Sequence, residues 1–447
     1  MKFPAYPKYK ASGVEWLGDV PEHWKVKAIK WESPVLRGAS PRPIDDPIYF
    51  DDDGEFVWVR ISDVTAAGMY LGVTEQKLSN LGSSLSVKLM PGALFLSIAG
   101  SVGKPCITQI KCCIHDGFVY FPRFKGEPKF LYYLFASGEP YRGLGKLGTQ
   151  LNLNTDTVGS IVAGFPDKDE QQAIAAFLDR ETWRIDRMVA KKRELIERLK
   201  EKRTALISRT VTRGLPPAAA SAAGLPENQT LKPSGLDWLG DIPAHWTLTK
   251  LVFVSNEIGD GLHGTPEFAD DSGIHFVNGN NLVDGSLRFF GNTRQVSKES
   301  HIMYRLPLGH NSILVSINGT IGNLAFYKGE EIVLGKSAAY INCGKKLRRE
   351  FLFKFLLTDN ARSFIDLELT GTTIRNLSLE SIRKLSIPLP PLPEQIVIVA
   401  YLDSETAKLD ALVMKVETAI ERLQEYRTAL IAAAVTGKID VRGVENE

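Results

Sequence analysis

The sequence predicts an α+β protein of two similar halves, each a mixed α/β domain of short strands followed by a long helix. Three observations support this prediction. A tryptophan motif occurs twice, as SGVEWLGDVPEHW at 12–24 and as SGLDWLGDIPAHW at 234–246. Two segments with helical periodicity, 170–215 and 394–439, also match each other. Between them, LSIAGSVGK is similar to VSINGTIGN. A repeat of this length indicates a duplicated module, so we expect pseudo-two-fold symmetry and neighbouring termini.

The repeat also sets the expected domain boundaries. The Pro-, Ala- and Gly-rich stretch RGLPPAAASAAGLPENQTLKP breaks the repeat and is expected to be an exposed linker. The predicted parts are a first mixed α/β domain at 1–168, a helix at 169–212, the linker at 213–233, a second mixed α/β domain at 234–392, and a helix with its tail at 393–440 and on to 447.

Composition narrows the class of protein. With 44% hydrophobic and 24% charged residues, the 447-residue chain has enough apolar side chains for packed cores. The net charge is only +2, so nucleic-acid binding would depend on local patches. No signal peptide or apolar run of membrane-spanning length is visible, which predicts a cytoplasmic protein. The four cysteines fit no zinc spacing and are expected to be reduced thiols.

The repeated tryptophans have a structural interpretation. We expect Trp16, Trp24, Trp238 and Trp246 to pack against the core of their own module, with the adjacent Gly-Asp and Pro residues forming turns. A ligand-binding aromatic cage is the alternative, and the sequence favours packing.

The two helical segments show a coiled-coil pattern. Apolar residues recur in steps of three and four, interrupted at Lys192, Thr406 and Arg427. The predicted seam comprises Leu178, Ile185, Leu199, Leu206, Leu402, Leu409, Val416, Leu423 and Leu430.

The charges of these helices suggest their partner. Residues 170–215 contain 12 Lys/Arg and 7 Asp/Glu, whereas residues 394–439 contain 5 and 7. Opposite net charge favours pairing of the two helices within one chain, and the expected two-fold pseudo-symmetry makes them antiparallel. The alternative is that each helix covers only its own domain.

The ends of both helices can also be predicted. We expect Asp169 to cap the first helix and Pro393 to lie in the first turn of the second. Gly214 and Gly437 are expected to follow their last turns.

Each variable region alternates short β-type runs with polar loops. The pattern predicts strands that enter loops at GEFVWVRISDV and GIHFVNGNNL. It predicts buried strands that lead into glycine turns at ALFLSIAG and SILVSINGTIG. The loop side chains are of types that read base edges or hold phosphates, although turn chemistry alone also explains many of them. The candidate DNA-binding residues are Arg37, Ser40, Arg42, Arg60, Lys104, Gln150, His263, Thr265, Asn278, Asn280, Asn281, Asn318 and Arg375.

No familiar catalytic pattern is visible. GSVGK lacks the spacing of a phosphate-binding loop, and the chain has no amino-methyltransferase tetrapeptide, H-E-x-x-H, G-x-S-x-G or Cys/His metal spacing. Pro166-Asp167 is not followed by an E-x-K at nuclease spacing. This favours a recognition scaffold without catalytic residues or a metal. Two alternatives are a stand-alone methyltransferase or nuclease with unrecognised motifs, and a homodimeric coiled-coil adaptor.

Together the motifs resemble the specificity subunit of type I restriction–modification systems (the HsdS family). The resemblance rests on paired GDIPxHW-like motifs, paired EQ…A…LD…T helices and the PLPPLPEQ lead-in, and it covers residues 12–440. The first copy departs from it, because FPDKDEQ lacks the Pro-Leu-Pro lead-in, which puts the start of the first helix in doubt.

The resemblance implies a function. It implies two target-recognition domains, each reading half of an asymmetric bipartite double-stranded DNA sequence, with the helices fixing the unread gap. Two methyltransferase subunits using S-adenosylmethionine are implied as partners, and they methylate adenines. ATP-dependent, Mg²⁺-requiring restriction subunits are implied as further partners. The chain itself would be non-catalytic and hold no cofactor.

Overall fold

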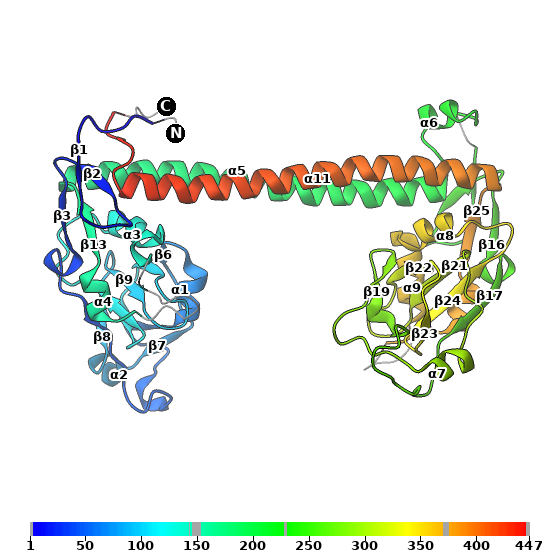
Figure 1. The fold of residues 1–447 in the computed structure, drawn as a ribbon, viewed down its shortest axis with the longest axis horizontal. Helices are drawn as coiled ribbons and strands as arrows, with labels where there is room; N and C mark the ends of the chain where they lie inside the picture. The colour runs from blue at the N-terminus through cyan, green and yellow to red at the C-terminus, as the bar shows by residue number, and fades with distance from the viewer. Residues whose placement is uncertain (1–2, 143, 145–152, 228–229, 370–374, 444–447) are drawn as a thin grey trace. The chain divides into compact units, whose positions relative to one another are not determined.

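The computed structural model describes residues 3–142, 144, 153–227, 230–369 and 375–443. The chain divides into two compact units, here called unit 1 (Met1–Lys192 with Glu417–Glu447) and unit 2 (Arg193–Val416). Both units contain strands and short helices together with segments of the two long helices (Figure 1). The units therefore differ from the halves of the repeat, because each long helix contributes to both.

Unit 1 contains two sheets and two smaller strand pairs. The five-stranded sheet has the order β4-β12-β9-β10-β6 and the four-stranded sheet the order β7-β5-β11-β8. Strands β5 and β11 run parallel, with Val59 opposite Ile114. The strands are β1 (Tyr9–Ala11), β2 (Asp19–Pro21), β3 (Lys25–Ala28), β4 (Leu36–Arg37), β5 (Phe56–Val59), β6 (Tyr70–Leu71), β7 (Gln76–Leu78), β8 (Val87–Leu89), β9 (Leu94–Ser97), β10 (Pro105–Thr108), β11 (Cys112–Ile114), β12 (Phe118–Tyr120) and β13 (Val162–Phe165).

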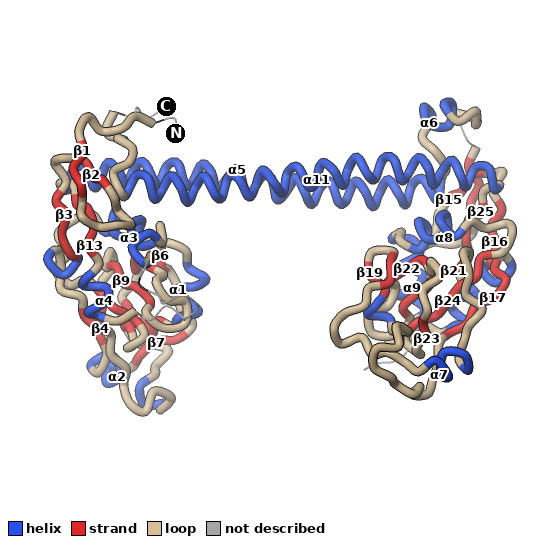
Figure 2. Tube along the Cα trace, in the orientation of Figure 1, coloured by secondary structure: helices blue, strands red, loops and turns tan. Residues whose placement is uncertain are grey.

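Short helices connect these strands, as the alternation of red and blue segments shows (Figure 2). The short helices of unit 1 are α1 (Ile61–Ala67), α2 (Asn80–Ser84), α3 (Pro128–Ala136) and α4 (Thr155–Ser160), with 3-10 turns η1 (Ile29–Trp31), η2 (Pro47–Tyr49) and η3 (Glu139–Tyr141).

Unit 2 repeats the plan with a smaller sheet. Strands β17-β24-β21-β22 form an antiparallel sheet, and β18 pairs with β23 in parallel, as β5 pairs with β11. The strands are β14 (Leu231–Pro233), β15 (Asp241–Pro243), β16 (Thr247–Lys250), β17 (Ser255–Asp260), β18 (His275–Val277), β19 (Leu282–Val283), β20 (Ser286–Leu287), β21 (Ser312–Ser316), β22 (Leu324–Phe326), β23 (Ile332–Leu334), β24 (Ala338–Cys343) and β25 (Ser386–Leu389). The short helices are α6 (Pro217–Ala222), α7 (Lys298–Met303), α8 (Arg349–Leu356), α9 (Asp359–Glu368) and α10 (Leu379–Lys384), with η4 (Leu251–Phe253) and η5 (Gly279–Asn281).

The long helices are α5 (Lys168–Arg213) and α11 (Leu392–Val435). In unit 1, Asp186 of α5 pairs with Arg427 of α11 at 2.9 Å between Oδ1 and Nε. In unit 2, Arg203 of α5 pairs with Asp410 of α11 at 3.0 Å. Moving forward along α5 thus corresponds to moving backward along α11, so the helices pack antiparallel, as predicted.

The predicted seam residues lie on the less exposed side of the two long helices. All nine seam residues are buried or half-buried, and Leu178, Leu402 and Leu430 are fully buried. Two of the three predicted interruptions, Thr406 and Arg427, have local explanations. Thr406 is buried and donates its hydroxyl to the Leu402 carbonyl at 2.7 Å. Arg427 forms the Asp186 ion pair described above.

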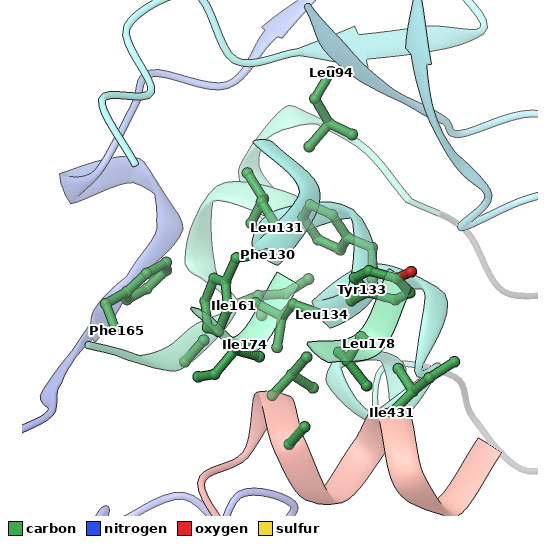
Figure 3. Close-up of a cluster of buried hydrophobic side chains, with 14 of the residues drawn as sticks. Leu94, Phe130, Leu131, Tyr133, Leu134, Ile161, Phe165, Ile174, Leu178 and Ile431 are labelled. Atoms are coloured by element: carbon green, nitrogen blue, oxygen red, sulfur yellow. The ribbon is translucent and has the colours of Figure 1, made fainter. Parts of the chain in front are cut away.

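The core of unit 1 joins the globular region to both long helices. Phe130 and Leu134 of α3 lie in the same buried cluster as Leu178 of α5 and Ile431 of α11 (Figure 3). Residues from opposite ends of the chain therefore stabilise one domain. The termini also meet, because the Asp440 amide donates to the Pro4 carbonyl at 2.8 Å. This confirms that the two ends of the chain are neighbours.

The repeated motifs form a lock between each domain and the start of its long helix. In unit 1 the buried Glu170 carboxylate accepts from Trp24 Nε1 at 3.0 Å and Tyr6 Oη at 2.7 Å, and it contacts His23 Nε2 at 2.7 Å. In unit 2 Glu394 accepts from Trp246 Nε1 at 3.1 Å and contacts His245 at 2.9 Å. Trp24 and Trp246 are buried, and Trp16 and Trp238 are half-buried against the same two cores, which confirms the packing role of all four. The bonds to the glutamates explain why His-Trp and Glu-Gln recur together.

The adjacent glutamine completes this lock. Gln171 donates to the Pro166 carbonyl and accepts from the Glu127 amide, at 3.0 and 2.9 Å. Gln395 makes the corresponding bonds to Pro390 and Arg348. Each glutamine therefore ties the first helical turn to a loop of its own domain.

Both long helices begin two residues before the glutamate of their EQ pair. The missing Pro-Leu-Pro lead-in therefore leaves the start of α5 unchanged. The predicted cap was wrong, since Asp167 and not Asp169 accepts the Glu170 amide hydrogen, at 2.9 Å. Gly214 and Gly437 adopt positive φ angles of 81° and 70° after the last turns, as expected.

Residues 213–233, which were expected to form an exposed linker, are only partly exposed. Leu215 is 5% exposed and Ala220 of α6 is fully buried, because both pack into the core of unit 2. Strand β14 at its end pairs with β15, as β1 pairs with β2. The alanine- and proline-rich composition gave no sign of helix α6 or strand β14, because tertiary packing stabilises both.

All four cysteines are free and buried. Burial raises the pKa of Cys106 to about 12 and that of Cys112 to about 11, so both remain protonated thiols at neutral pH. Within the described ranges, no helix is both long enough and apolar enough to span a bilayer.

Candidate nucleic-acid interface

In unit 1 the candidate residues gather at one edge of the sheets. Because β5 and β11 are parallel, their carboxyl ends lie side by side, which places Arg60 next to the loop at His115 and Asp116. The turn after β9 joins this edge, since the Ile98 amide donates to the Gly117 carbonyl at 2.8 Å. Loops separated by tens of residues thus form one polar surface, here called the unit 1 edge.

Asp116 is the centre of this edge. Arg37 Nε donates to its backbone carbonyl at 2.5 Å, and Ser40 Oγ to its Oδ1 at 3.1 Å. Arg42 donates to Oδ2 at 3.1 Å, with 77% of its side chain exposed. The structure thus brings three predicted residues to Asp116, which the sequence prediction missed: two bond its carboxylate and one bonds its backbone carbonyl. The turn between two buried strands, CCIHDGFVYF, was the available signal.

His115 supports the loop from beneath. Its ring lies 5.8 Å from Trp58 and 4.6 Å from Phe118, between centroids. Burial lowers the pKa of His115, and the neighbouring Asp116 partly offsets this shift. A neutral imidazole can accept a hydrogen bond, and Nδ1 lies 2.9 Å from the donating Gly117 amide. His115 therefore stabilises the turn and presents Asp116 to solvent.

Helix α1 organises the other predicted residues of unit 1. Arg60 is its N-cap residue and donates to Gln76 Oε1 at 2.6 Å. Lys104 Nζ donates to the carbonyl of Thr65 at 2.6 Å. The turn before Lys104 joins two strands, β9 and β10, which agrees with its rejection as a phosphate-binding loop. Gln150 lies outside the described residues.

Unit 2 forms an equivalent edge at the carboxyl ends of β18 and β23. Asn278 Oδ1 accepts from Ser337 Oγ at 2.9 Å, and Ser337 Oγ also accepts from the Gly279 amide at 2.9 Å. Asn318 Nδ2 donates to the Lys336 carbonyl at 3.4 Å. The loop of residues 335–337 thus occupies the position that 115–117 occupies in unit 1, and Lys336 replaces Asp116.

The other candidates of unit 2 have different surroundings. His263 is exposed and its Nε2 lies 2.6 Å from Asp260 Oδ2. Thr265, Asn280 and Arg375 are exposed. Asn281 is 3% exposed and donates to the Arg288 carbonyl and to Thr293 Oγ1. Asn281 does not project from its loop as a DNA-binding candidate should, because its buried side-chain amide donates its hydrogen bonds to the next loop.

The chemistry of these edges is that of recognition. Guanidinium, amide, hydroxyl and carboxylate groups are arranged on exposed loops above packed strands. In the parts of the chain that the structure describes, no three His, Cys, Asp or Glu side chains form a potential metal site. The two edges differ in the charge of their central residue, Asp116 in unit 1 and Lys336 in unit 2.

Comparison with known proteins assigns the family. The model of the type I restriction modification DNA specificity domain matches residues 21–198 and 267–422. The chain therefore belongs to this family, and its named relatives are specificity subunits, a non-catalytic class.

Two relatives illustrate the similarity. The type I restriction enzyme EcoBI specificity subunit of Escherichia coli is 24% identical over 296 residues, which are 65% of this chain and 61% of that subunit. The chain thus spans about six-tenths of that relative's length. The protein named as the MjaX specificity subunit of Methanocaldococcus jannaschii is 22% identical over 95% of this chain and 96% of its own.

Solved structures share the fold. The HsdS subunit from Thermoanaerobacter tengcongensis aligns with a TM-score of 0.54 at 17% identity, over 94% of this chain and 98% of that chain. A chain from a study of complex assembly and conformational transition of the type I R-M system aligns with a TM-score of 0.67 at 17% identity, over 94% and 99%.

Proposed function

We propose that this chain is the DNA-specificity subunit of a type I restriction–modification complex, and that each unit reads one half of an asymmetric, bipartite double-stranded target. The carrying observation is the pair of equivalent edges with different central residues, Asp116 and Lys336. A carboxylate accepts from the cytosine amino group, whereas a lysine donates to guanine O6 and N7. Units with different reading groups select different half-sites, which makes the target asymmetric.

In this proposal the long helices set the gap between the half-sites. Each helix is continuous through residues that belong to both units, and the antiparallel packing holds the pair in register. A helix of 46 residues is about 69 Å long. Such a length suits a spacer between two recognition domains.

The same helices are the proposed docking surface for two methyltransferase subunits. Met188 on α5 in unit 1 and Leu412 on α11 in unit 2 are equivalent in the repeat, and they are 38% and 46% exposed. Equivalent exposed apolar residues suit two copies of one partner. S-adenosylmethionine would serve these partners, and ATP and Mg²⁺ would serve the restriction subunits.

Sequencing of methylated adenines tests this function. The chain would be co-expressed with its methyltransferase partners in a host without other adenine methylation. We expect methylation at one two-part motif with a fixed gap. Exchanging residues 26–165 for the corresponding region of a relative should change one half of the motif only. Methylation without a two-part motif, or loss of both halves after the exchange, would contradict the proposal.

A further inference from the structure

The loop of residues 288–294 in unit 2 carries an exposed aromatic pair that the recognition edge described above does not use. Phe289 is 40% and Phe290 is 45% exposed. Single exposed apolar residues are ordinary on protein surfaces. Two adjacent aromatics on one loop are less so, and their surroundings indicate a specific use.

The loop is held rigidly against the unit 2 edge. Asn281 donates to the Arg288 carbonyl at 3.0 Å and to Thr293 Oγ1 at 3.1 Å. Thr293 Oγ1 in turn accepts from the Phe290 amide at 2.8 Å. Because Asn281 directly follows the exposed Asn280, the aromatic pair is anchored beside a candidate base-reading residue.

The rings themselves are pre-arranged. Phe289 stacks on His275 of β18, with centroids 3.9 Å apart and planes 6° from parallel. This stack supports the loop from the strand that also leads into Asn278. Phe290 is the first residue of a tight turn, since the Thr293 amide donates to its carbonyl at 2.9 Å. An exposed ring on a rigid turn loses little conformational entropy when it is buried by a ligand.

The surrounding charges favour a nucleic-acid occupant. Arg288 and Arg294 flank the pair in sequence. The Arg288 side chain is 58% exposed, with Asp284 as an ion-pair partner at 3.5 Å. Arg294 lies over the Phe268 ring at 3.2 Å from its centroid. Arginines that can contact phosphates beside a protruding aromatic pair are typical of proteins that insert a side chain between base pairs.

Unit 1 has no such pair at the corresponding place. GVTEQ at 72–76 matches GNTRQ at 291–295, so Tyr70 and Leu71 correspond to Phe289 and Phe290. Leu71 is fully buried, and both residues form β6, which pairs with β10. The exposed aromatic pair of unit 2 is therefore not repeated at the corresponding place, Tyr70 and Leu71, in unit 1.

We infer that Phe289 and Phe290 form a wedge that unstacks one base step in the half-site read by unit 2, with Phe290 inserting and Phe289 supporting it. The inference rests on the proposed function, because it needs unit 2 to contact DNA. Flexible pyrimidine–purine steps yield most easily to such a wedge, so the protein would also select a base step by its deformability.

Fluorescence of 2-aminopurine tests the wedge. The base is placed in turn at the purines of the target, and each duplex is titrated with the assembled methyltransferase complex without methyl donor. Unstacking raises 2-aminopurine fluorescence. We expect a several-fold rise at one step of the unit 2 half-site. Phe290→Ala should remove this rise and weaken specific binding about 5- to 50-fold, because base–aromatic stacking is lost.

Matched variants separate insertion from general effects. Phe253→Ala removes another aromatic of unit 2, 76% exposed and outside this loop, and should leave both signals unchanged. Phe290→Trp should retain the fluorescence rise, since it keeps a stacking ring. A rise that persists in Phe290→Ala, or no rise in the wild-type complex bound specifically to its target, overturns the wedge alone. Absence of sequence-specific binding by the wild-type complex overturns the proposed function and the wedge together.

Discussion

At the scale of single residues, Asp116 holds together three loop side chains of the unit 1 edge. Loop position and side-chain chemistry predict Arg37, Ser40 and Arg42 as candidates, and the structure brings all three to one residue. Arg37 donates to the Asp116 backbone carbonyl, whereas Ser40 and Arg42 donate to its carboxylate. Asp116 itself was missed, because a single acidic residue after a buried strand has no distinctive local pattern. Asn281 was wrongly predicted to be available for DNA binding. Its side chain is buried by a neighbouring loop, and sequence spacing does not show that contact.

The buried carboxylate of Glu170 should contribute strongly to the stability of unit 1. Its replacement by alanine leaves Tyr6 Oη and Trp24 Nε1 without their acceptor in the core. Each buried donor without a partner costs about 1–3 kcal/mol, so we expect a loss of about 2–4 kcal/mol. Urea denaturation measures this loss. Glu194→Ala, at a side chain 60% exposed on the same helix, is the control and should change stability by less than about 0.5 kcal/mol. Equal effects of both substitutions would refute the lock.

Asp116 should determine how well one half-site is discriminated. Substituting alanine releases Ser40 and Arg42 from their shared partner and removes a negative charge that would repel phosphates. We expect affinity for unrelated DNA to rise and discrimination at one base pair of one half-site to fall by about 1–3 kcal/mol. Competition binding of the assembled complex to targets with single base changes provides the measurement. An unaltered preference at every position of both half-sites would exclude Asp116 as a specificity determinant.

At the scale of elements, periodicity was the most informative signal. The heptad pattern predicted which face of each long helix is less exposed, because a 3.5-residue repeat sustained over about 40 residues is specific to a coiled coil. Short strands were predicted less completely. The parallel pairing of β5 with β11 and of β18 with β23 joins segments more than 50 residues apart, and it alone explains why distant loops share an edge. Strand β14, which precedes the second tryptophan motif and pairs with β15 inside it, lies in the segment that was expected to be a linker.

The exposed faces of the long helices should bind the methyltransferase partners at two equivalent places. Leu412→Asp introduces a charge into the proposed contact in unit 2 and leaves Met188 in unit 1 intact. We expect the complex to lose one of its two methyltransferase subunits, because a buried unpaired carboxylate opposes docking. Native mass spectrometry reports the stoichiometry. Ala411→Asp makes the same charge change at the adjacent exposed residue and should retain both subunits. Loss of both subunits, or of neither, in Leu412→Asp would argue against two equivalent docking places.

At the scale of the whole molecule, the duplication could be recognised from the sequence because both copies need the same hydrogen-bonded lock residues. His-Trp and Glu-Gln recur since each long helix is tied to its domain by one buried carboxylate and one buried amide. The sequence did not show which residues belong to each compact unit. Residues 417–447 complete unit 1, so the two halves of the sequence are intertwined and do not fold side by side as separate repeats.

The length of the helix pair should set the gap between half-sites. Repeating residues 193–199 in α5 and residues 410–416 in α11 adds one heptad to each helix and preserves the seam. Seven residues lengthen a helix by about 10.5 Å, which corresponds to about three base pairs. Sequencing of methylated sites should therefore show both half-sites unchanged and the gap longer by about three. Inserting the heptad into α5 alone shifts the antiparallel register of Asp186 and Arg203 against their partners, and should impair assembly. New half-sites with the original gap would show that the helices do not act as a ruler, because only the spacing depends on their length.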